Sequence, residues 1–130
     1  MPTPTPTVVA CASSPLPESV IYFGTSDEFP KIVRIDINNF DGAVGQSQQV
    51  TVQGWGDSPI EAVDVVLHTD HEYSQTFGLH VVSQSVHSGI YKDVWTLSYM
   101  IQDTHECIYT YTFTVRQDNG QTKTSVLMVR

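Results

Sequence analysis

Hydrophobic and polar residues alternate with a period of two along most of the chain after about residue 30. The alternating segments are short, and clusters of Gly, Asp, Asn, Ser and Pro separate them, as is typical of turns between strands. No segment shows the longer period of an amphipathic helix. The pattern therefore predicts an antiparallel all-β domain with strands over 31–37, 49–54, 60–69, 76–82, 94–102, 107–116 and 123–130.

Two segments near the C-terminus carry the strongest core pattern. In 94–102 and in 107–116, large aromatic and aliphatic residues occupy every second position, and mainly Thr and Ser lie between them. β-Branched Thr suits an exposed strand face because it fits the pleat and keeps its hydroxyl hydrated. An Asp-Asn-Gly tripeptide at 118–120 then predicts a hairpin turn, since Asn and Gly accept positive φ angles. The predicted structural core contains Trp95, Leu97, Tyr99, Tyr109, Tyr111 and Phe113.

The N-terminal segment has a different composition from the rest of the chain. Residues 2–7 alternate Pro and Thr, which favours a stiff, extended spacer over a packed core. Residues 19–24 contain four consecutive apolar residues and could form an additional strand, either at the edge of the sheet or donated to another copy. We therefore predict a linker over 1–28, which includes this possible strand, and one β-sandwich domain over 29–130.

With these segments the chain resembles the bacterial immunoglobulin-like domains of cell-surface proteins, over roughly residues 29 to 130. The resemblance rests on an Asn-Phe-Asp-Gly turn before Gln-Gln-Val-Thr-Val-Gln, and on Ile-Glu-Ala-Val-Asp-Val-Val-Leu, Trp-Thr-Leu-Ser-Tyr and Tyr-Thr-Tyr-Thr-Phe-Thr-Val. It implies an antiparallel immunoglobulin-like β-sandwich of about seven to eight strands, with Asp103 and Tyr109 in the region of the tyrosine corner. Antibody domains place a core cysteine two residues after that tyrosine, but Tyr111 stands there, so their inter-sheet disulfide is not expected.

The chain has two cysteines, Cys11 and Cys107, and neither lies in a Cys-x-x-Cys arrangement. A disulfide between them is the simplest use, and two unpaired thiols are the alternative. If formed, the bond would join the N-terminal segment to the domain and would stabilise the fold by about 4 to 5 kcal/mol in the chain-entropy model.

The charge balance excludes several classes of partner. Six Lys and Arg stand against fourteen Asp and Glu, which gives a net charge of −8 and a pI near 4.7. We therefore expect repulsion from nucleic acids and from anionic membrane surfaces. The apolar runs are only a few residues long, so no membrane insertion is expected either.

Several clusters of titratable residues were considered as sites of chemistry. His68, Asp70, His71 and Glu72 could hold zinc if their loop folded inward, but a solvated polar loop is the simpler interpretation. A Cys-His pair lies in the segment Asp103, His105, Glu106 and Cys107, but adjacent residues on an extended strand point apart.

Aspartates in turns could together bind calcium, although Asp is also a good turn residue. These are Asp41, Asp57, Asp93, Asp103 and Asp118. The common catalytic signatures do not occur, so we predict no enzyme activity, no metal site and no cofactor.

Three aromatic residues near strand ends or loops are the candidate ligand contacts: Trp55, Tyr73 and Tyr91. Exposed aromatic rings can stack on sugars or anchor a partner. The alternative for Trp55 is that it caps the core between Gly54 and Gly56.

The sequence thus predicts a non-catalytic, extracellular module with a structural or adhesive role in a bacterial surface protein or appendage. Its partner would be a protein or a glycan at the cell surface, or another copy of itself. One alternative is a pilus-like subunit that polymerises by donating its N-terminal strand. A second alternative is a carbohydrate-binding module of a secreted hydrolase.

Overall fold

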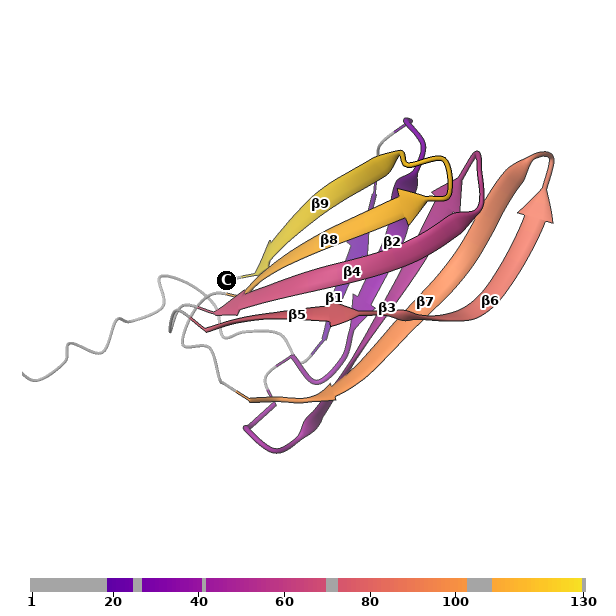
Figure 1. Cartoon of the computed structure of the whole chain (residues 1–130). Helices are drawn as coiled ribbons and strands as arrows, with labels where there is room; N and C mark the ends of the chain where they lie inside the picture. Colours follow the sequence, from indigo (N-terminus) through magenta and orange to yellow (C-terminus); the bar gives the residue numbers. More distant parts are fainter. Residues whose placement is uncertain (1–18, 25–26, 41, 70–72, 103–108, 130) are drawn as a thin grey trace, which may run out of the picture.

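A computed structural model describes residues 19–24, 27–40, 42–69, 73–102 and 109–129. These residues form nine strands in two antiparallel sheets that pack face to face, and they contain no helix (Figure 1). In particular, no helix in this part of the chain is long and apolar enough to span a membrane. The strands are β1 (Val20–Phe23), β2 (Lys31–Ile37), β3 (Ser47–Gly56), β4 (Ile60–Thr69), β5 (Ser74–Gly78), β6 (His80–His87), β7 (Ile90–Met100), β8 (Tyr109–Gln117) and β9 (Thr122–Val129).

The order of the strands is that of an immunoglobulin domain. One sheet has the order β1-β2-β3-β7-β6 and the other has the order β5-β4-β8-β9. Immunoglobulin domains pair strands A-B-E-D in one sheet and C-F-G in the other, and variable-type domains add C′ beside C. Assigning β2 to β9 in chain order to A, B, C, C′, D, E, F and G reproduces both sheets. The predicted immunoglobulin-like β-sandwich is therefore confirmed, with β1 as a further strand beside β2.

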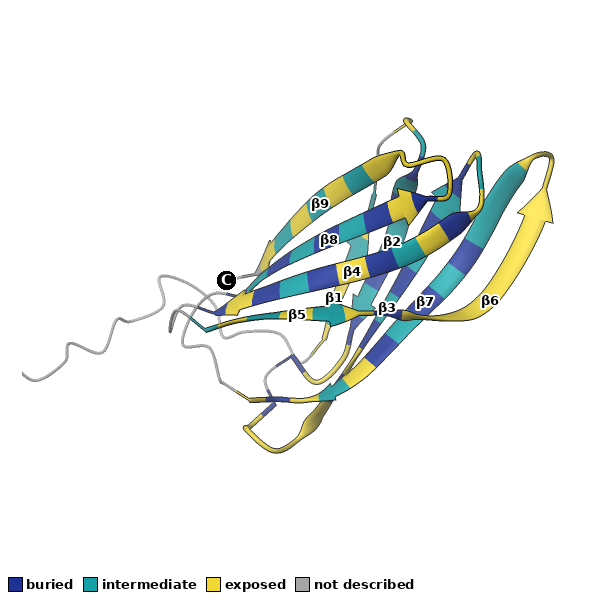
Figure 2. Ribbon diagram, in the orientation of Figure 1, coloured by how far each residue is buried: buried dark blue, intermediate teal, exposed yellow. Residues whose placement is uncertain are grey.

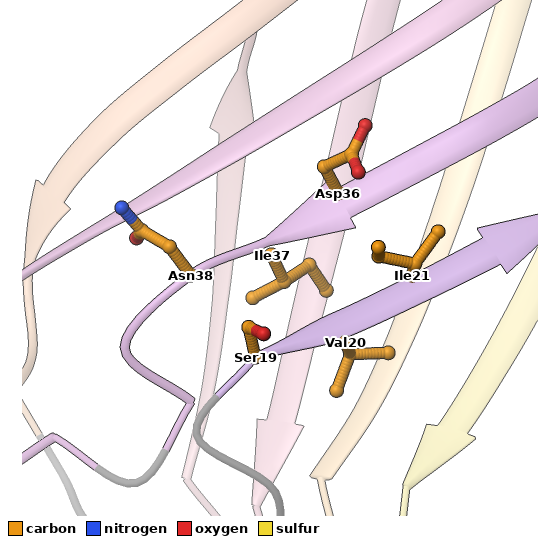
Figure 3. A pocket seen from close by; sticks show the side chains of 6 residues that line it. All are labelled: Ser19, Val20, Ile21, Asp36, Ile37 and Asn38. Atoms are coloured by element: carbon orange, nitrogen blue, oxygen red, sulfur yellow. The ribbon is translucent and has the colours of Figure 1, made fainter.

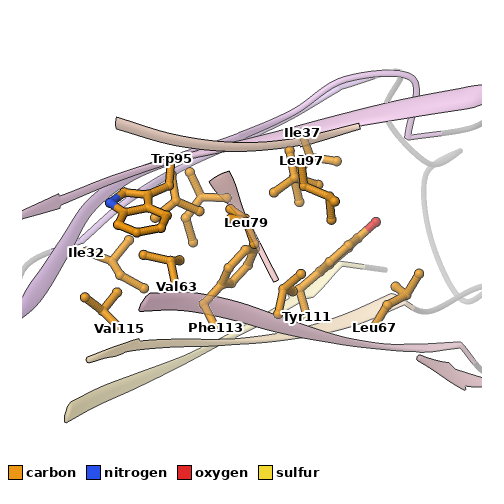
Figure 4. Packing of buried hydrophobic residues seen from close by; sticks show 14 of the residues in the cluster. Ile32, Ile37, Val63, Leu67, Leu79, Trp95, Leu97, Tyr111, Phe113 and Val115 are labelled. Atoms are coloured by element: carbon orange, nitrogen blue, oxygen red, sulfur yellow. The ribbon is translucent and has the colours of Figure 1, made fainter. Parts of the chain in front are cut away.

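The core lies between the two sheets and is built by the period-two pattern. Alternate residues of β3, β4 and β8 are buried, and their neighbours point to solvent (Figure 2). Aromatic side chains of β8 meet aliphatic and aromatic side chains of the opposite sheet, among them Trp95 (Figure 4). Phe40, in the turn after β2, packs edge-on against Tyr109 with ring centroids 4.9 Å apart. Of the predicted core residues, Trp95, Leu97, Tyr109, Tyr111 and Phe113 are buried and Tyr99 is half-buried against the cluster.

The prediction of a single strand over 76–82 is wrong. The chain leaves one sheet after Gly78, buries Leu79, and enters the other sheet at His80, so the segment contributes to both β5 and β6. In Figure 1 the ribbon of β5 runs directly on into β6. The crossing moves β6 to the far edge of the five-stranded sheet, where it pairs only with β7.

Strand β7 begins four residues earlier than the prediction of 94–102. A two-residue turn at Ser88 and Gly89 joins β6 to β7, and both residues have positive φ angles, of 51° and 76°. This combination is that of a primed hairpin turn, which matches the twist of the two strands. Asp93 consequently lies inside a strand and is buried, and the expectation that it belongs to a turn is wrong.

The edge strand β1 pairs antiparallel with β2 of its own chain, from Val20 opposite Ile37 to Phe23 opposite Arg34. Of the two arrangements considered for residues 19–24, the structure has the strand added to the chain's own sheet. A bulge between Ile32 and Arg34 shifts the register of β2 against β3. Strict alternation along 31–37 places Val33 on the core face with Ile35 and Ile37, but because of this bulge Ile32 is buried and Val33 is only half-buried.

Candidate functional site

The outer face of the five-stranded sheet carries an ordered set of aromatic, cationic and polar side chains. Strand pairing aligns Lys31, Trp55, Lys92 and Ser85 in one row across β2, β3, β7 and β6. Residues directly opposite each other on antiparallel strands point to the same face, about 4.5 to 5.5 Å apart. The second row runs through Phe23, Arg34, Gln53, Val94 and Ser83, and the third through Ile21, Asp36, Thr51, Thr96 and His80.

Trp55 lies at the centre of the first row, between two ammonium groups. The Nζ atom of Lys92 is 4.3 Å from the centroid of the indole ring, and the Nζ atom of Lys31 is 5.3 Å from it. Lys31 also lies 4.8 Å from the ring centroid of Phe29. These are cation–π distances, so the electron-rich faces of the rings hold the two ammonium groups at the surface. We call Phe29, Lys31, Trp55 and Lys92 the Trp55 patch.

The charge on this face is opposite to the net charge of the chain. The strands of the five-stranded sheet contain three cations, Lys31, Arg34 and Lys92, and two carboxylates, Asp36 and Asp93. Asp93 points into the core, and Arg34 binds Asp36 through two hydrogen bonds of 2.8 and 2.9 Å. The outer face therefore has a positive balance in a chain of net charge −8.

The three predicted contact aromatics do not form one surface. Trp55 is half-buried on the outer face and does not cap the core between its two glycines. Tyr91 lies opposite Gly56 in β7, one position before Lys92. Because successive residues of a strand point to opposite faces, the Tyr91 side chain points to the inner face, at the same end of the sandwich as Trp55. Tyr73 lies before β5 at the opposite end, where its carbonyl accepts a 2.9 Å hydrogen bond from the amide of Thr69. Trp55 is thus the only one of the three that belongs to the Trp55 patch.

Most of the considered metal and thiol residues lie outside the described residues. These are Cys11, Asp41, Asp70, His71, Glu72, Asp103, His105, Glu106 and Cys107. His68 is exposed on the outer face of β4. Asp118 accepts a hydrogen bond from the hydroxyl of Ser58 and donates its amide to the carbonyl of Pro59, so it holds the turns at one end of the sandwich. Within the described ranges, no three His, Cys, Asp or Glu side chains are grouped closely enough to hold a metal ion.

A shallow pocket of about 180 Å³ lies beside β1, and Figure 3 shows the side chains that line it. It is open to solvent, and it is smaller than the roughly 300 to 1,000 Å³ of typical small-molecule sites. Its one carboxylate, Asp36, is paired with Arg34. The flat outer face is therefore the better candidate for a site. The pocket is lined by Ser19, Val20, Ile21, Asp36, Ile37 and Asn38.

Buried polar groups brace the sheet behind this face. The Gln48 side-chain oxygen accepts hydrogen bonds from the hydroxyls of Tyr99 and Tyr111, the second at 3.1 Å. Burial raises the pKa of both phenols; the neighbouring Tyr99 and Tyr109 add to the rise at Tyr111, whereas the hydrogen bond with Tyr111 partly offsets it at Tyr99. Asp93 accepts 3.3 Å hydrogen bonds from the indole nitrogen of Trp95 and the side-chain amide of Gln84. These pairings satisfy polar atoms in the core and stabilise the fold, and they leave the outer face free for contacts.

The sequence analysis named Trp55 as a candidate contact but did not name Lys31 or Lys92, which the structure places beside its ring. Both lysines lie in strands that are far from Trp55 in sequence, and only the register of β2 and β7 against β3 brings them to the ring. The available signal was compositional, because Lys and Arg are scarce in this chain and three of the six lie in strands of one sheet.

The fold and the site define an immunoglobulin-like β-sandwich with a flat aromatic and cationic face. No protein-family model matches the chain, and no curated protein sequence matches it. Among solved structures, part of a cycloalternan-degrading enzyme from Trueperella pyogenes is similar to it, with a TM-score of 0.45 and 19% sequence identity. The match covers 66% of this chain and 14% of that enzyme, so the chain corresponds to a small part of it.

Proposed function

We propose that this chain is a non-catalytic, extracellular immunoglobulin-like module that attaches to an acidic glycan through the outer face of its five-stranded sheet. The resemblance to bacterial cell-surface domains supports the setting and the adhesive role. The observation that carries the proposal is the position of Trp55 between two ammonium groups, on a positive face of an acidic protein.

The chemistry of the three rows suits a sugar with a carboxylate substituent. An aromatic ring offers a flat apolar surface to the C–H face of a sugar. The ammonium groups of Lys31 and Lys92 lie 5.3 and 4.3 Å from the centroid of the Trp55 ring, so each can pair with a carboxylate of a ligand that binds at this ring. Gln53 and Thr51, in the next two rows of β3, offer an amide and a hydroxyl for the sugar hydroxyls.

The net charge of −8 sets the kind of acidic ligand that can bind. At physiological ionic strength charges are screened beyond about 8 Å, so the ligand responds mainly to the groups within and around the Trp55 patch. Most carboxylates of the chain lie outside the nine strands. The two lysines can bind a glycan whose carboxylates are widely spaced on an uncharged backbone. A dense polyanion such as nucleic acid would extend beyond the lysines and be repelled by the acidic residues on the rest of the surface.

The side chains on the face also support a binding role without catalysis. The one outward carboxylate in the strands of this sheet, Asp36, is held by Arg34 and does not approach Trp55 in the strand pairing. The groups around the ring are ammonium groups and amides, which bind and orient a ligand.

Dextrans with matched backbones test the proposal. Titration of the full chain with sparsely carboxymethylated dextran, followed by tryptophan fluorescence, should give saturable binding that weakens with added NaCl. Unmodified dextran should bind at least tenfold more weakly. Lys92→Gln, and Trp55→Ala followed by titration calorimetry because it lacks the fluorescent reporter, should each weaken binding about tenfold or more, because each removes one of the two recognised features.

The control variant is Lys123→Gln, which removes the same charge from β9 in the opposite sheet and should bind like the native chain. Equal binding of charged and unmodified dextran, or an equal loss in Lys92→Gln and Lys123→Gln, would contradict the assigned site. Binding of dense dextran sulfate above the sparsely substituted dextran would contradict the ligand class.

The proposed contact does not depend on the parent protein, so it also applies to a carbohydrate-binding module of a secreted hydrolase. The strand-donation alternative instead requires β1 to leave β2 and join the sheet of another copy. It predicts filaments of the full chain, visible by electron microscopy, that disappear when residues 1–24 are deleted.

A further inference from the structure

Strand β6 is an exposed sheet edge of eight residues. All eight of its residues are exposed, which Figure 2 shows along its whole length. It contains no charged residue and no proline, two features that commonly protect edge strands. The other edges differ, because β1 and β5 have only four and five residues and β9 carries Lys123. β6 is thus the edge in the described part of the chain that is best suited to pair with another strand.

The sequence of β6 is complementary to itself. Residues Val82-Ser83-Gln84-Ser85-Val86 read the same in both directions around Gln84. Two antiparallel copies centred on Gln84 therefore place Val82 opposite Val86 and Ser83 opposite Ser85. Matched apolar and hydroxyl pairs of this kind are the stabilising units of an antiparallel sheet.

We infer that β6 is a homodimerisation strand, which pairs antiparallel with β6 of a second copy around a two-fold axis at Gln84. A two-fold axis requires an interface that is complementary to itself, and the palindrome meets that requirement. The two five-stranded sheets then become one continuous ten-stranded sheet. The bulge of β6 against β7 lies at Val82, the first residue of the palindrome, and Ser83 to His87 pair with β7 without a further shift, so the regular part of the strand contains the axis at Gln84.

The side chains on the two faces of β6 fit this arrangement. Val86 is 59% exposed and Val82 is 62% exposed, and pairing removes both from water beside their counterparts. Directly opposite residues point to the same side, so both copies present their Trp55 patches on one outer face. A polymeric ligand could then bind two patches at once, with the gain expected of linked sites. This last consequence rests on the proposed function, whereas the dimer itself does not.

Single cysteines test the register. Gln84→Cys places two thiols opposite each other at the axis, at a Cα separation of about 5 Å that a disulfide can bridge. In Ser85→Cys the two introduced thiols are two residues out of register, and their Cα atoms are about 8 Å apart, beyond the reach of a disulfide. Mild oxidation of the full chain should link Gln84→Cys at least tenfold faster than Ser85→Cys, and the native chain under the same oxidant gives the background from Cys11 and Cys107.

Sedimentation equilibrium tests the dimer. The native chain should approach twice its mass of 14.5 kDa as the concentration rises. Val86→Lys introduces a charge opposite Val82 of the other copy and should be monomeric with an unchanged thermal midpoint, because residue 86 is exposed in the single chain. Thr124→Lys on the β9 edge is the control and should dimerise like the native chain.

Three outcomes would overturn the inference: a monomeric native chain, a dimer that persists in Val86→Lys, or equal crosslinking of the two cysteine variants. A native chain that dimerises but does not bind carboxymethylated dextran would contradict the proposed function alone.

Discussion

Replacing Gln48 by Leu removes the centre of the buried polar network behind the outer face of the five-stranded sheet. Gln48 is 1% exposed, and its side chain makes three hydrogen bonds. Its oxygen accepts from the hydroxyls of Tyr99 and Tyr111, and its nitrogen donates to the carbonyl of Asn39 at 3.3 Å. Leu has a similar volume, so the substitution mainly removes hydrogen-bond partners and creates little empty space.

The three partners differ in how readily water can replace the lost bond. Tyr111 is 1% exposed, so water cannot replace Gln48, and its hydroxyl keeps only the hydrogen bond with Tyr99; this loss costs about 1 to 3 kcal/mol. Tyr99 is half-buried and Asn39 is exposed, so water can reach both groups and each contributes less than about 1 kcal/mol. We therefore expect Gln48→Leu to lower the free energy of unfolding by about 2 to 3 kcal/mol.

Urea unfolding followed by tryptophan fluorescence measures this loss. Gln49→Leu, the neighbouring position on the exposed face of β3, is the control and should change the free energy by less than about 0.5 kcal/mol. Adding Tyr111→Phe to Gln48→Leu removes the buried hydroxyl that has lost its bond to Gln48 and should restore about 1 to 2 kcal/mol. A neutral Gln48→Leu, or a double variant whose loss equals the sum of the two single losses, would refute the network.

Three further predictions concern pH, packing and a buried charge. Burial raises the pKa of Tyr99 and Tyr111, so the folded chain keeps protons that the unfolded chain releases near pH 10. The contribution of each tyrosine to stability should therefore be constant below that pH and fall above it by up to about 1.4 kcal/mol per pH unit, as alkaline urea titrations would show. Gly56→Ala places a Cβ atom 2.6 Å from a backbone oxygen and should cost about 2 kcal/mol of unfolding free energy, whereas Gly54→Ala meets only a methyl group at 3.3 Å and should cost less. Asp93→Leu leaves a buried indole N–H without its acceptor, so its thermal midpoint should fall below that of Asp93→Asn, which keeps an acceptor oxygen.

The strands with strict alternation were predictable because burial on one face is a local property of the sequence. The predicted strand over 60–69 coincides with β4, and the aromatic series at 109–115 lies within β8. The turn at Asp118, Asn119 and Gly120 was also predicted, although only Gly120 has a positive φ angle, of 87°. Asn119 contributes through its side-chain oxygen, which accepts a 3.0 Å hydrogen bond from the amide of Gln121.

The passage from β5 to β6 was not predictable from alternation. No polar turn separates the two strands, because Leu79 is buried at the crossing. Every residue of β6 is exposed, so the strand has no buried face and no period-two signal. The Ser88-Gly89 dipeptide was a usable turn signal that would have placed the start of β7 correctly.

The candidate site was only partly predictable for a similar reason. A lone Trp55 between glycines has two readings, as a core cap or as a contact, and local sequence does not separate them. The separation comes from the pairing of β2 and β7 with β3, which puts Lys31 and Lys92 beside the ring on the outer face. Such long-range register is set by the packing of the whole sandwich.

Mapping the ligand contact by nuclear magnetic resonance tests the central claim most directly. The ¹⁵N-labelled full chain would be titrated with short carboxymethylated dextran, and the amide and indole shifts would be followed. The account predicts that the largest changes fall on the indole of Trp55 and on Lys31 and Lys92, with smaller changes at Gln53 and Thr51 and none on the Thr-rich outer face of β8. Changes centred on β8, or no changes at ligand concentrations that saturate the fluorescence signal, would contradict it.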